Sequence, residues 1–525
     1  MKRSFSEIAP RALVFVALLL ATSSFLAPSR ANEPEETSSE PPVETLRQKA
    51  AEGDGTACFK LAVWFYRDGD ERDLVEASKW ARRGVELNDA RSYAFLGGLY
   101  AKGDGVEQNW SEAIALLRKG AELGSGEAWF SLGVCYETGQ GVDKDFEEAA
   151  SCFRRGAALD NGASCASLGA CYVAGRGVDK DPEEAVRYFR KGAELENSRA
   201  YLGLGVCYMD GIGVERDPRE AIEWYRKGVE KGNGDCCANL GFCYQNGLGV
   251  DAAPEKAIEM YRRGAELKSG RACNYLGVCY SRGLGVESDV AKAVELFRHG
   301  AEYGSGEACA NLAFCYLVGD GVERDPEESF RWSHKGAQLG YANAFVDLAS
   351  FYVNGFFVER DMSEAMKLYR RGAELGDGES RYRLGLGYLY GDGVEKNVEE
   401  AITQLKLAGD ADVKGACFEL GRLYFDGELV EKDMSRGVDW FRKGARLGDG
   451  RCCLRLARCC LSGQGVAADL KEEETWLRRS AELGEADACI RLAEIYSVGN
   501  AKVRKNPAEA ARYLQRAREL MESTF

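Results

Sequence analysis

Apolar and polar positions along this chain repeat with a fixed spacing of 36 residues. Tyrosine stands at ten successive positions of this spacing, which we call the marker positions. Cys460 and Tyr496 continue the series, and Phe65 precedes it at a spacing one residue shorter. A period of this size predicts stacked supersecondary units and not a single globular core. The ten marker tyrosines are Tyr100, Tyr136, Tyr172, Tyr208, Tyr244, Tyr280, Tyr316, Tyr352, Tyr388 and Tyr424.

Each copy of the repeat is expected to form a helix, a turn and a second helix, as residues 126–160 illustrate. Trp129 and Tyr136 fall at helical spacing on one face of the first helix. Gly139 should end that helix, because glycine accepts the left-handed conformation of a C-terminal cap. After the turn, Asp145 is a suitable N-cap for the second helix.

Small residues recur at one position in each helix of the repeat. Glycine inside a helix costs roughly 1 kcal/mol relative to alanine. Its regular use at these positions therefore predicts that two backbones approach closely there. The first-helix glycines are Gly133, Gly169, Gly205, Gly241, Gly277, Gly385 and Gly421. The second-helix glycines are Gly120, Gly156, Gly192, Gly228, Gly264 and Gly300.

The order L-G-x-x-Y, G-x-G-V and D-x-x-x-A resembles the Sel-one-like repeat family, which is related to the tetratricopeptide repeats. The resemblance covers about thirteen copies between residues 46 and 520. It implies an all-α fold, a right-handed α-solenoid whose first helices line a concave inner surface, and a role as an adaptor or scaffold. Phe357, Leu429 and Ala501 depart from the pattern by replacing the second turn glycine. In one copy the matching residues are Leu168, Gly169, Tyr172, Gly175, Gly177, Val178, Asp181 and Ala185.

The N-terminal residues 1–31 have the pattern of a secretory signal peptide. A basic start precedes an apolar run, and small residues at Ser29 and Ala31 predict cleavage after Ala31. An uncleaved membrane anchor is the alternative, although the run is short for a membrane span. Residues 32–45 are acidic and rich in Pro and Ser, which predicts a disordered spacer before the repeat array at 46–525. We therefore expect a secreted or periplasmic protein without a membrane span in its mature chain.

The chain is strongly acidic, with a formal net charge of −15. Cleavage of residues 1–31 would remove four positive charges and one negative charge, which leaves −18. A surface of this sign argues against nucleic acid and against anionic membrane surfaces as partners.

The 19 cysteines follow the repeat, and most lie directly before a marker or seven residues before it. Two cysteines six residues apart on one helix are separated by about 9 Å along its axis, so they cannot form a disulfide. We expect buried thiols that fill tight helix contacts. Cys452, Cys453, Cys459 and Cys460 could be a metal cluster, but pairs seven residues apart lie about 10 Å apart axially, which disfavours tetrahedral zinc.

The family resemblance also bears on the disulfides. Secreted cysteine-rich relatives join the end of one repeat to the start of the next by a disulfide. The later partner of that bridge matches Cys165, Cys237, Cys273 and Cys309 in this chain. The earlier partner position holds Ala157, Val229, Ala265 and Ala301, so the resemblance implies that this bridge is lost.

The sequence offers no constellation for catalysis. Its two histidines, His299 and His334, fall in the basic last turns of second helices, where they complement the helix dipole. HExxH, GxSxG and GxxxxGK[ST] do not occur. Some cysteine-rich relatives have been described as β-lactam-binding or β-lactam-hydrolysing, but the chain contains no S-x-x-K. We therefore predict no catalytic residue, no metal and no cofactor.

One set of residues on the first helices is a candidate binding surface. The residue two before each marker should face the concave side, and it is apolar in the middle copies and charged at Arg422, Arg458 and Glu494. An apolar line in a groove suits an extended peptide or an amphipathic helix. The alternative is that these side chains are buried between neighbouring copies. The candidate residues at this position are Val134, Val206, Phe242, Val278, Phe314 and Leu386, and Phe130, six residues before its marker, flanks them; we call these seven residues the apolar stripe.

These observations favour an extracytoplasmic protein-interaction scaffold that binds a polypeptide on its concave face. One alternative is a hydrolase or effector that acts on cell-wall material or β-lactams. A second alternative is a structural component of the cell envelope.

Overall fold

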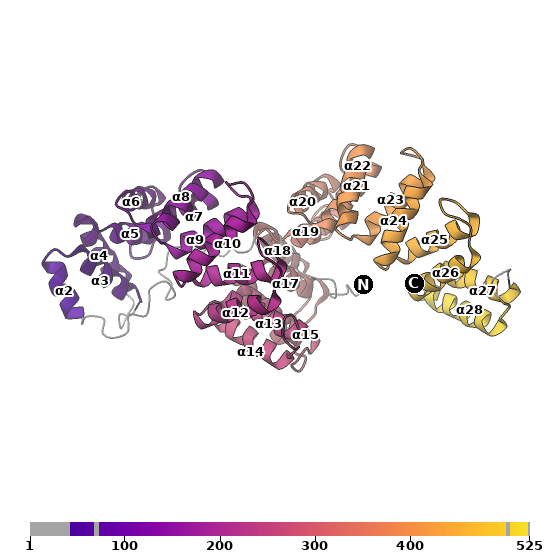
Figure 1. Ribbon diagram of the computed structural model, residues 1–525, viewed down its shortest axis with the longest axis horizontal. Helices are drawn as coiled ribbons and strands as arrows, with labels where there is room; N and C mark the ends of the chain where they lie inside the picture. Colours follow the sequence, from indigo (N-terminus) through magenta and orange to yellow (C-terminus); the bar gives the residue numbers. More distant parts are fainter. Residues whose placement is uncertain (1–42, 68–72, 500–503, 523–525) are drawn as a thin grey trace. The chain divides into compact units, whose positions relative to one another are not determined.

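The computed structural model describes residues 43–67, 73–499 and 504–522. The predicted signal peptide 1–31, most of the spacer 32–45 and Ala501 lie outside these described residues. Within them the regular secondary structure is helical throughout, with one helix followed by thirteen helix pairs (Figure 1). The prediction of an all-α solenoid of thirteen two-helix repeats is confirmed.

The helices have nearly uniform lengths, which reflects the uniform spacing of the sequence. Helix α2 spans Val43–Ala51, so the last three residues of the predicted spacer are helical. The first helices of the pairs are α3 (Gly55–Arg67), α5 (Ala90–Lys102), α7 (Gly126–Thr138), α9 (Gly162–Ala174), α11 (Ser198–Asp210), α13 (Gly234–Asn246), α15 (Gly270–Arg282), α17 (Gly306–Val318), α19 (Ala342–Asn354), α21 (Gly378–Tyr390), α23 (Lys414–Asp426), α25 (Gly450–Ser462) and α27 (Ala486–Val498). The second helices are α4 (Leu74–Glu86), α6 (Trp110–Glu122), α8 (Phe146–Ala158), α10 (Pro182–Glu194), α12 (Pro218–Glu230), α14 (Pro254–Glu266), α16 (Val290–Glu302), α18 (Pro326–Gln338), α20 (Met362–Glu374), α22 (Val398–Asp410), α24 (Met434–Arg446), α26 (Leu470–Glu482) and α28 (Pro507–Glu522).

The chain divides into two compact units, one that ends at Ser305 and one that begins at Gly306. Within each unit every first helix packs on its own second helix, and that second helix packs on the first helix of the next pair. The buried side chains form a series of clusters, one after another along the repeats. For example, Phe153 of α8 joins Leu168 and Cys171 of α9 in one such cluster.

The helix boundaries follow the predicted capping residues. Gly139 ends α7 in the left-handed conformation at φ 74°. The Asp145 side chain accepts hydrogen bonds from the backbone amides of Glu147 at 2.9 Å and Glu148 at 3.0 Å. Five second helices, α10, α12, α14, α18 and α28, start with proline, whose missing N–H is not needed at that position.

The recurring glycines lie where helices approach each other most closely. A Cβ atom placed on Gly133 would lie 2.5 Å from the ring of Phe153, so any larger residue would displace the ring. A Cβ atom on Gly156 would lie 2.2 Å from the Ser164 hydroxyl of the next repeat. The predicted close approach to another backbone is found at Gly156, whose Cβ would lie 3.2 Å from the Gly126 carbonyl oxygen, whereas Gly133 faces an aromatic ring.

The second turn glycine docks each turn onto the preceding repeat. Gly177 has φ 66°, and a Cβ atom there would lie 1.8 Å from the carbonyl oxygen of Phe146 at the start of α8. Phe357 takes the same left-handed conformation at φ 68° although it is not glycine. Its side chain is 52% exposed and contacts the ring of Phe330 at 5.6 Å.

Adjacent basic residues on the second helices link three successive repeats. Arg190 donates a hydrogen bond to the Tyr208 hydroxyl of the next repeat at 2.9 Å. Lys191 donates to the carbonyl oxygen of Ala157 in the preceding second helix at 2.7 Å. The forward bond from arginine to a marker tyrosine recurs at Arg82–Tyr100, Arg118–Tyr136, Arg226–Tyr244, Arg262–Tyr280, Arg370–Tyr388 and Arg478–Tyr496. The backward bond to a carbonyl recurs at Arg263–Val229, Arg479–Ala445 and Arg516–Glu482.

Candidate functional site

The first unit contains five residues of the apolar stripe, and they differ in exposure. Phe130 and Val134 of α7 are half-buried and pack against the cluster around Phe153. Val206 of α11 is 3% exposed and belongs to a buried cluster. The burial of Val206 agrees with the alternative that these side chains pack between neighbouring copies.

The two other stripe residues of the first unit keep part of their surface accessible. Phe242 of α13 is half-buried, and its ring lies 5.9 Å from the ring of Tyr275 in the next repeat. Val278 of α15 is also half-buried. These two side chains are therefore partly accessible.

The second unit contains the last two stripe residues. Phe314 of α17 is 39% exposed, which is high for a ring on a packed first helix. Leu386 of α21 is half-buried. The stripe is thus represented in each unit by at least one aromatic side chain with accessible surface, Phe242 in the first and Phe314 in the second.

All 19 cysteines lie in described residues, and all are buried without a disulfide. The predicted placement of these side chains in helix contacts is confirmed. Burial raises the pKa of the thiols at Cys135, Cys171, Cys207 and Cys243 to about 12. Burial likewise raises the pKa of Cys165, Cys237, Cys273 and Cys309 to about 11, with smaller effects from nearby charges at three of them. Thiols of this kind are poor nucleophiles at neutral pH.

The two histidines lie outside any cluster of possible metal ligands in the described residues. His299 stacks on Tyr303 in the same unit, with ring centroids 6.3 Å apart. His334 occupies the position eighteen residues before Tyr352, where most other copies carry arginine. The described part of the chain contains no group of three or more His, Cys, Asp and Glu side chains arranged to hold a metal.

No helix among the described residues is long and apolar enough to cross a membrane.

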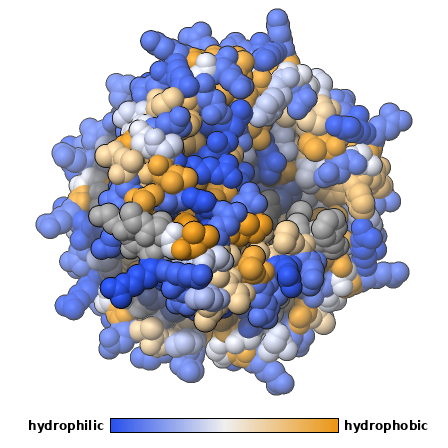
Figure 2. All heavy atoms as spheres, turned by 90° about the vertical axis from the view of Figure 1, so that its right-hand side faces the viewer, coloured by the Kyte–Doolittle hydropathy of each residue, from blue (hydrophilic) through white to orange (hydrophobic). Residues whose placement is uncertain are grey.

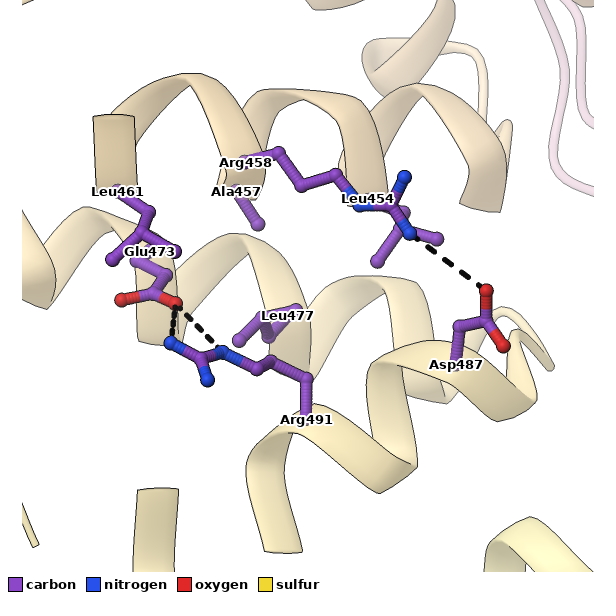
Figure 3. Close-up of a pocket in the computed structure, with 8 residues that line it drawn as sticks. All are labelled: Leu454, Ala457, Arg458, Leu461, Glu473, Leu477, Asp487 and Arg491. Atoms are coloured by element: carbon purple, nitrogen blue, oxygen red, sulfur yellow. Dashed lines mark hydrogen bonds and ion pairs between the residues drawn. The ribbon is translucent and has the colours of Figure 1, made fainter. Parts of the chain in front are cut away.

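A small cavity lies between α25, α26 and α27 in the second unit, and its accessible space is about 190 Å³ (Figure 3). Four apolar side chains and four charged ones border it. Figure 2 faces the side of the second unit that carries α25–α28, and this face is largely hydrophilic with small hydrophobic groups. The lining residues are Leu454, Ala457, Arg458, Leu461, Glu473, Leu477, Asp487 and Arg491.

Glu473 is the unusual member of this lining. Its side chain is 2% exposed, and one carboxylate oxygen, Oε1, accepts hydrogen bonds from Nε and Nη2 of Arg491, both at 3.2 Å. The other oxygen, Oε2, is buried and has no hydrogen-bond partner. On the rim, Arg458 Nη2 lies 3.8 Å from Oδ2 of Asp487, which is a long ion pair.

Glu473 stands at a repeat position that is otherwise small, four residues after the cap of the second helix. This regularity is the signal that could have identified it in the sequence, because a carboxylate replaces a close-packed methyl group in one copy alone. The twelve equivalent residues are Ala77, Ala113, Ala149, Ala185, Ala221, Ala257, Ala293, Ser329, Ala365, Ala401, Gly437 and Ala510.

Three comparisons place the chain among known proteins. No curated protein matches it. A crystal structure of a protective antigen of uropathogenic Escherichia coli, described as displaying an SLR fold, is 28% identical over 85% of this chain and 94% of that one, with a TM-score of 0.45. A Sel1 repeat protein from Oxalobacter formigenes is 23% identical over 50% of this chain and 97% of that one, with a TM-score of 0.39. Cysteine-rich protein B of Helicobacter pylori is 25% identical over 25% of this chain and 93% of that one, with a TM-score of 0.22.

The model of the Sel1 repeat matches this chain thirteen times. The matched segments are 55–89, 90–125, 127–161, 162–197, 198–233, 234–269, 270–304, 306–341, 346–377, 378–412, 415–449, 450–485 and 486–520. They coincide with the thirteen helix pairs and leave α2 outside the array. The chain therefore belongs to the Sel1 repeat family, whose members are typically scaffolds for protein interactions.

Proposed function

We propose that this protein is an extracytoplasmic scaffold that binds a polypeptide partner through the apolar stripe. The observation that carries the proposal is the accessible aromatic surface at Phe314, which is 39% exposed, and at the half-buried Phe242. Aromatic side chains that are supported by packing and still accessible are favourable anchors at protein interfaces. Val206, being buried, would support its neighbours and not contact the ligand.

The charge of the chain indicates what the ligand should look like. A formal net charge of −15 favours a ligand whose apolar contact surface is bordered by basic residues. An extended peptide or one face of an amphipathic helix can present apolar side chains in such a line. The partner class is therefore a basic polypeptide segment with apolar anchors.

Site-specific cross-linking tests this proposal. A photoreactive amino acid at position 314 should capture one defined protein, which mass spectrometry then identifies. With that purified partner, Phe242→Ala and Phe314→Ala should each weaken binding about tenfold, equivalent to about 1.4 kcal/mol. Phe356→Ala is the matched control, because Phe356 is 40% exposed in the same unit as Phe314 but lies in a turn. Equal binding by all three variants would contradict the proposal.

The same purified material separates the two alternatives. A hydrolase would release product from cell-wall material or a β-lactam without any added protein. A structural envelope component would remain with the insoluble envelope after both anchor residues are changed. The scaffold instead requires a soluble partner whose capture depends on Phe242 or Phe314.

A further inference from the structure

Glu473, which borders the cavity between α25, α26 and α27, has a carboxylate oxygen that lacks a donor. Glu473 uses Oε1 for both of its hydrogen bonds to Arg491, and Oε2 is buried with no partner. In Figure 3 the Glu473 oxygen without a dashed line lies on the side away from Arg491, near Leu461. Buried carboxylate oxygens in folded proteins normally accept hydrogen bonds, so this oxygen is suited to a donor from outside the chain.

The arginines beside the cavity do not supply that donor. Arg491 gives Nε and Nη2 to Oε1 of Glu473, and its Nη1 donates to Glu494 at 3.1 Å. The guanidinium of Arg458 points toward Asp487 on the far side of the cavity (Figure 3). Neither arginine therefore donates a hydrogen bond to Oε2.

The size and lining of the cavity restrict what the ligand can be. A space of about 190 Å³ exceeds the volume of about 150 Å³ that holds benzene in an engineered apolar cavity. Leu454, Leu461 and Leu477 supply apolar walls that suit a short hydrocarbon stem. A positively charged donor forms a stronger hydrogen bond to a carboxylate than a neutral donor does.

We propose that this cavity binds an alkylammonium group, with Glu473 Oε2 accepting a hydrogen bond from the ammonium and the leucine side chains packing against its hydrocarbon stem. The group comes from a lysine side chain of a polypeptide or from a free alkylamine. The lysine source rests on the proposed function as a polypeptide scaffold, whereas the free amine does not depend on it.

Calorimetric titration of the full mature chain tests this inference with three probes. Nα-acetyl-lysine N-methylamide carries the ammonium on a peptide-like backbone, and n-pentylamine carries it without a backbone. Nα-acetyl-norleucine N-methylamide has a similar stem but no ammonium. The inference expects binding of the lysine amide or of pentylamine, and at least tenfold weaker binding of the norleucine amide. Preference for the lysine amide would identify a polypeptide source, and preference for pentylamine would identify a free amine.

Two variants of Glu473 and one control make the result specific. Glu473→Gln keeps the shape but removes the charge, and Glu473→Ala restores the residue that ten other copies carry, so the array should fold. Both should weaken ammonium binding at least tenfold. Glu472→Ala is the control, because Glu472 is the exposed neighbour of the same charge, and it should leave binding unchanged.

Three outcomes would overturn the inference. They are no heat of binding at millimolar probe, equal binding of the norleucine amide, and full binding by Glu473→Ala. Circular dichroism of each variant confirms that the helices are intact. No step uses the unidentified protein partner, so this inference and the scaffold proposal can fail separately.

Discussion

Arg262 donates a hydrogen bond from Nη2 to the hydroxyl of Tyr280, 3.2 Å away and eighteen residues later in the chain. The arginine lies on α14 and the tyrosine on α15, so the bond crosses from one repeat to the next. This relationship gives the marker tyrosines a physical role, because their hydroxyls accept from the preceding repeat. The lysine of α16, Lys292, lies 4.4 Å from the centroid of the same ring, and its hydrogen bond together with that of Arg262 lowers the pKa of Tyr280.

The Arg262–Tyr280 bond should be measurable as a coupling energy. Arg262→Gln and Tyr280→Phe should each lower the free energy of unfolding by about 1 kcal/mol, since a typical hydrogen bond contributes that much. The double variant should lose less than the sum, with a coupling of at least about 0.5 kcal/mol. Urea unfolding of all four proteins provides the measurement. Strict additivity would mean that the bond contributes nothing to stability.

A second turn glycine, Gly177, and a glycine between two repeats, Gly232, should differ in their tolerance of alanine. Gly177 and Gly232 both have left-handed φ values, 66° and 72°, but only Gly177 faces a backbone carbonyl within 4 Å. Gly232→Ala should therefore lose about 1 kcal/mol, which is the cost of the conformation alone. Gly177→Ala should lose at least about twice that, because its Cβ would meet the Phe146 carbonyl. Equal losses in denaturant melts would show that the turn does not dock as described.

The buried thiols should make the protein sensitive to alkaline pH. Cys135 and Cys171 have their pKa raised by burial from the ordinary 9.0 to about 12. Below pH 9 native and unfolded thiols are both protonated, so this contribution to stability is fully present. Between pH 9 and 12 the unfolded thiols ionise first, and stability falls as pH rises.

Two measurements check this behaviour of the cysteines. The decline of the melting temperature between pH 9 and 11 should become shallower in the variant with Cys135→Ala and Cys171→Ala. Iodoacetamide at pH 8 should label the native chain slowly and the denatured chain at all 19 cysteines. Rapid labelling of the native protein, or isolation with most cysteines already in disulfides, would contradict the prediction.

The exported chain should begin at Asn32. This expectation rests on the basic start, the apolar run and the small residues Ser29 and Ala31, all of which precede the described residues. N-terminal sequencing of protein recovered outside the cytoplasm gives the answer directly. A protein that retains Met1 in that fraction would reject cleavage and favour the membrane-anchor alternative. Ala31→Leu should slow processing, because the peptidase reads a small residue there.

Much of the fold could be predicted because the local signals agree in nearly every copy. Asp145 and Gly139 mark helix ends, and Gly133 marks a close contact, through sterics that act within a few residues or one neighbouring helix. The bond from Arg190 to the marker tyrosine of the next repeat follows from no local signal of this kind. That contact spans two repeats, so a pattern read within one copy does not reveal it.

The exposure of the apolar stripe could not be derived in the same way. Val206 and Phe314 occupy the same repeat position, yet one is 3% exposed and the other 39% exposed. The difference depends on the neighbouring side chains of each copy, such as Leu202, which shares a buried cluster with Val206. Glu473 likewise cannot be recognised within one copy, because it stands out only against the twelve small residues at the same position of the other copies.

The paired basic residues of the second helices have a consequence for how such an array can change length. Where both bonds form, as with Arg190 and Lys191, a copy supplies one donor for the tyrosine ahead of it and one donor for the carbonyl behind it. Duplication or loss of a whole copy of 36 residues therefore preserves the spacing between these donors and their acceptors. Loss of half a copy would separate these donors from the tyrosine hydroxyl and the backbone carbonyl that accept their hydrogen bonds. Gene recombination can thus add or remove entire repeats while the hydrogen bonds between neighbouring repeats are retained.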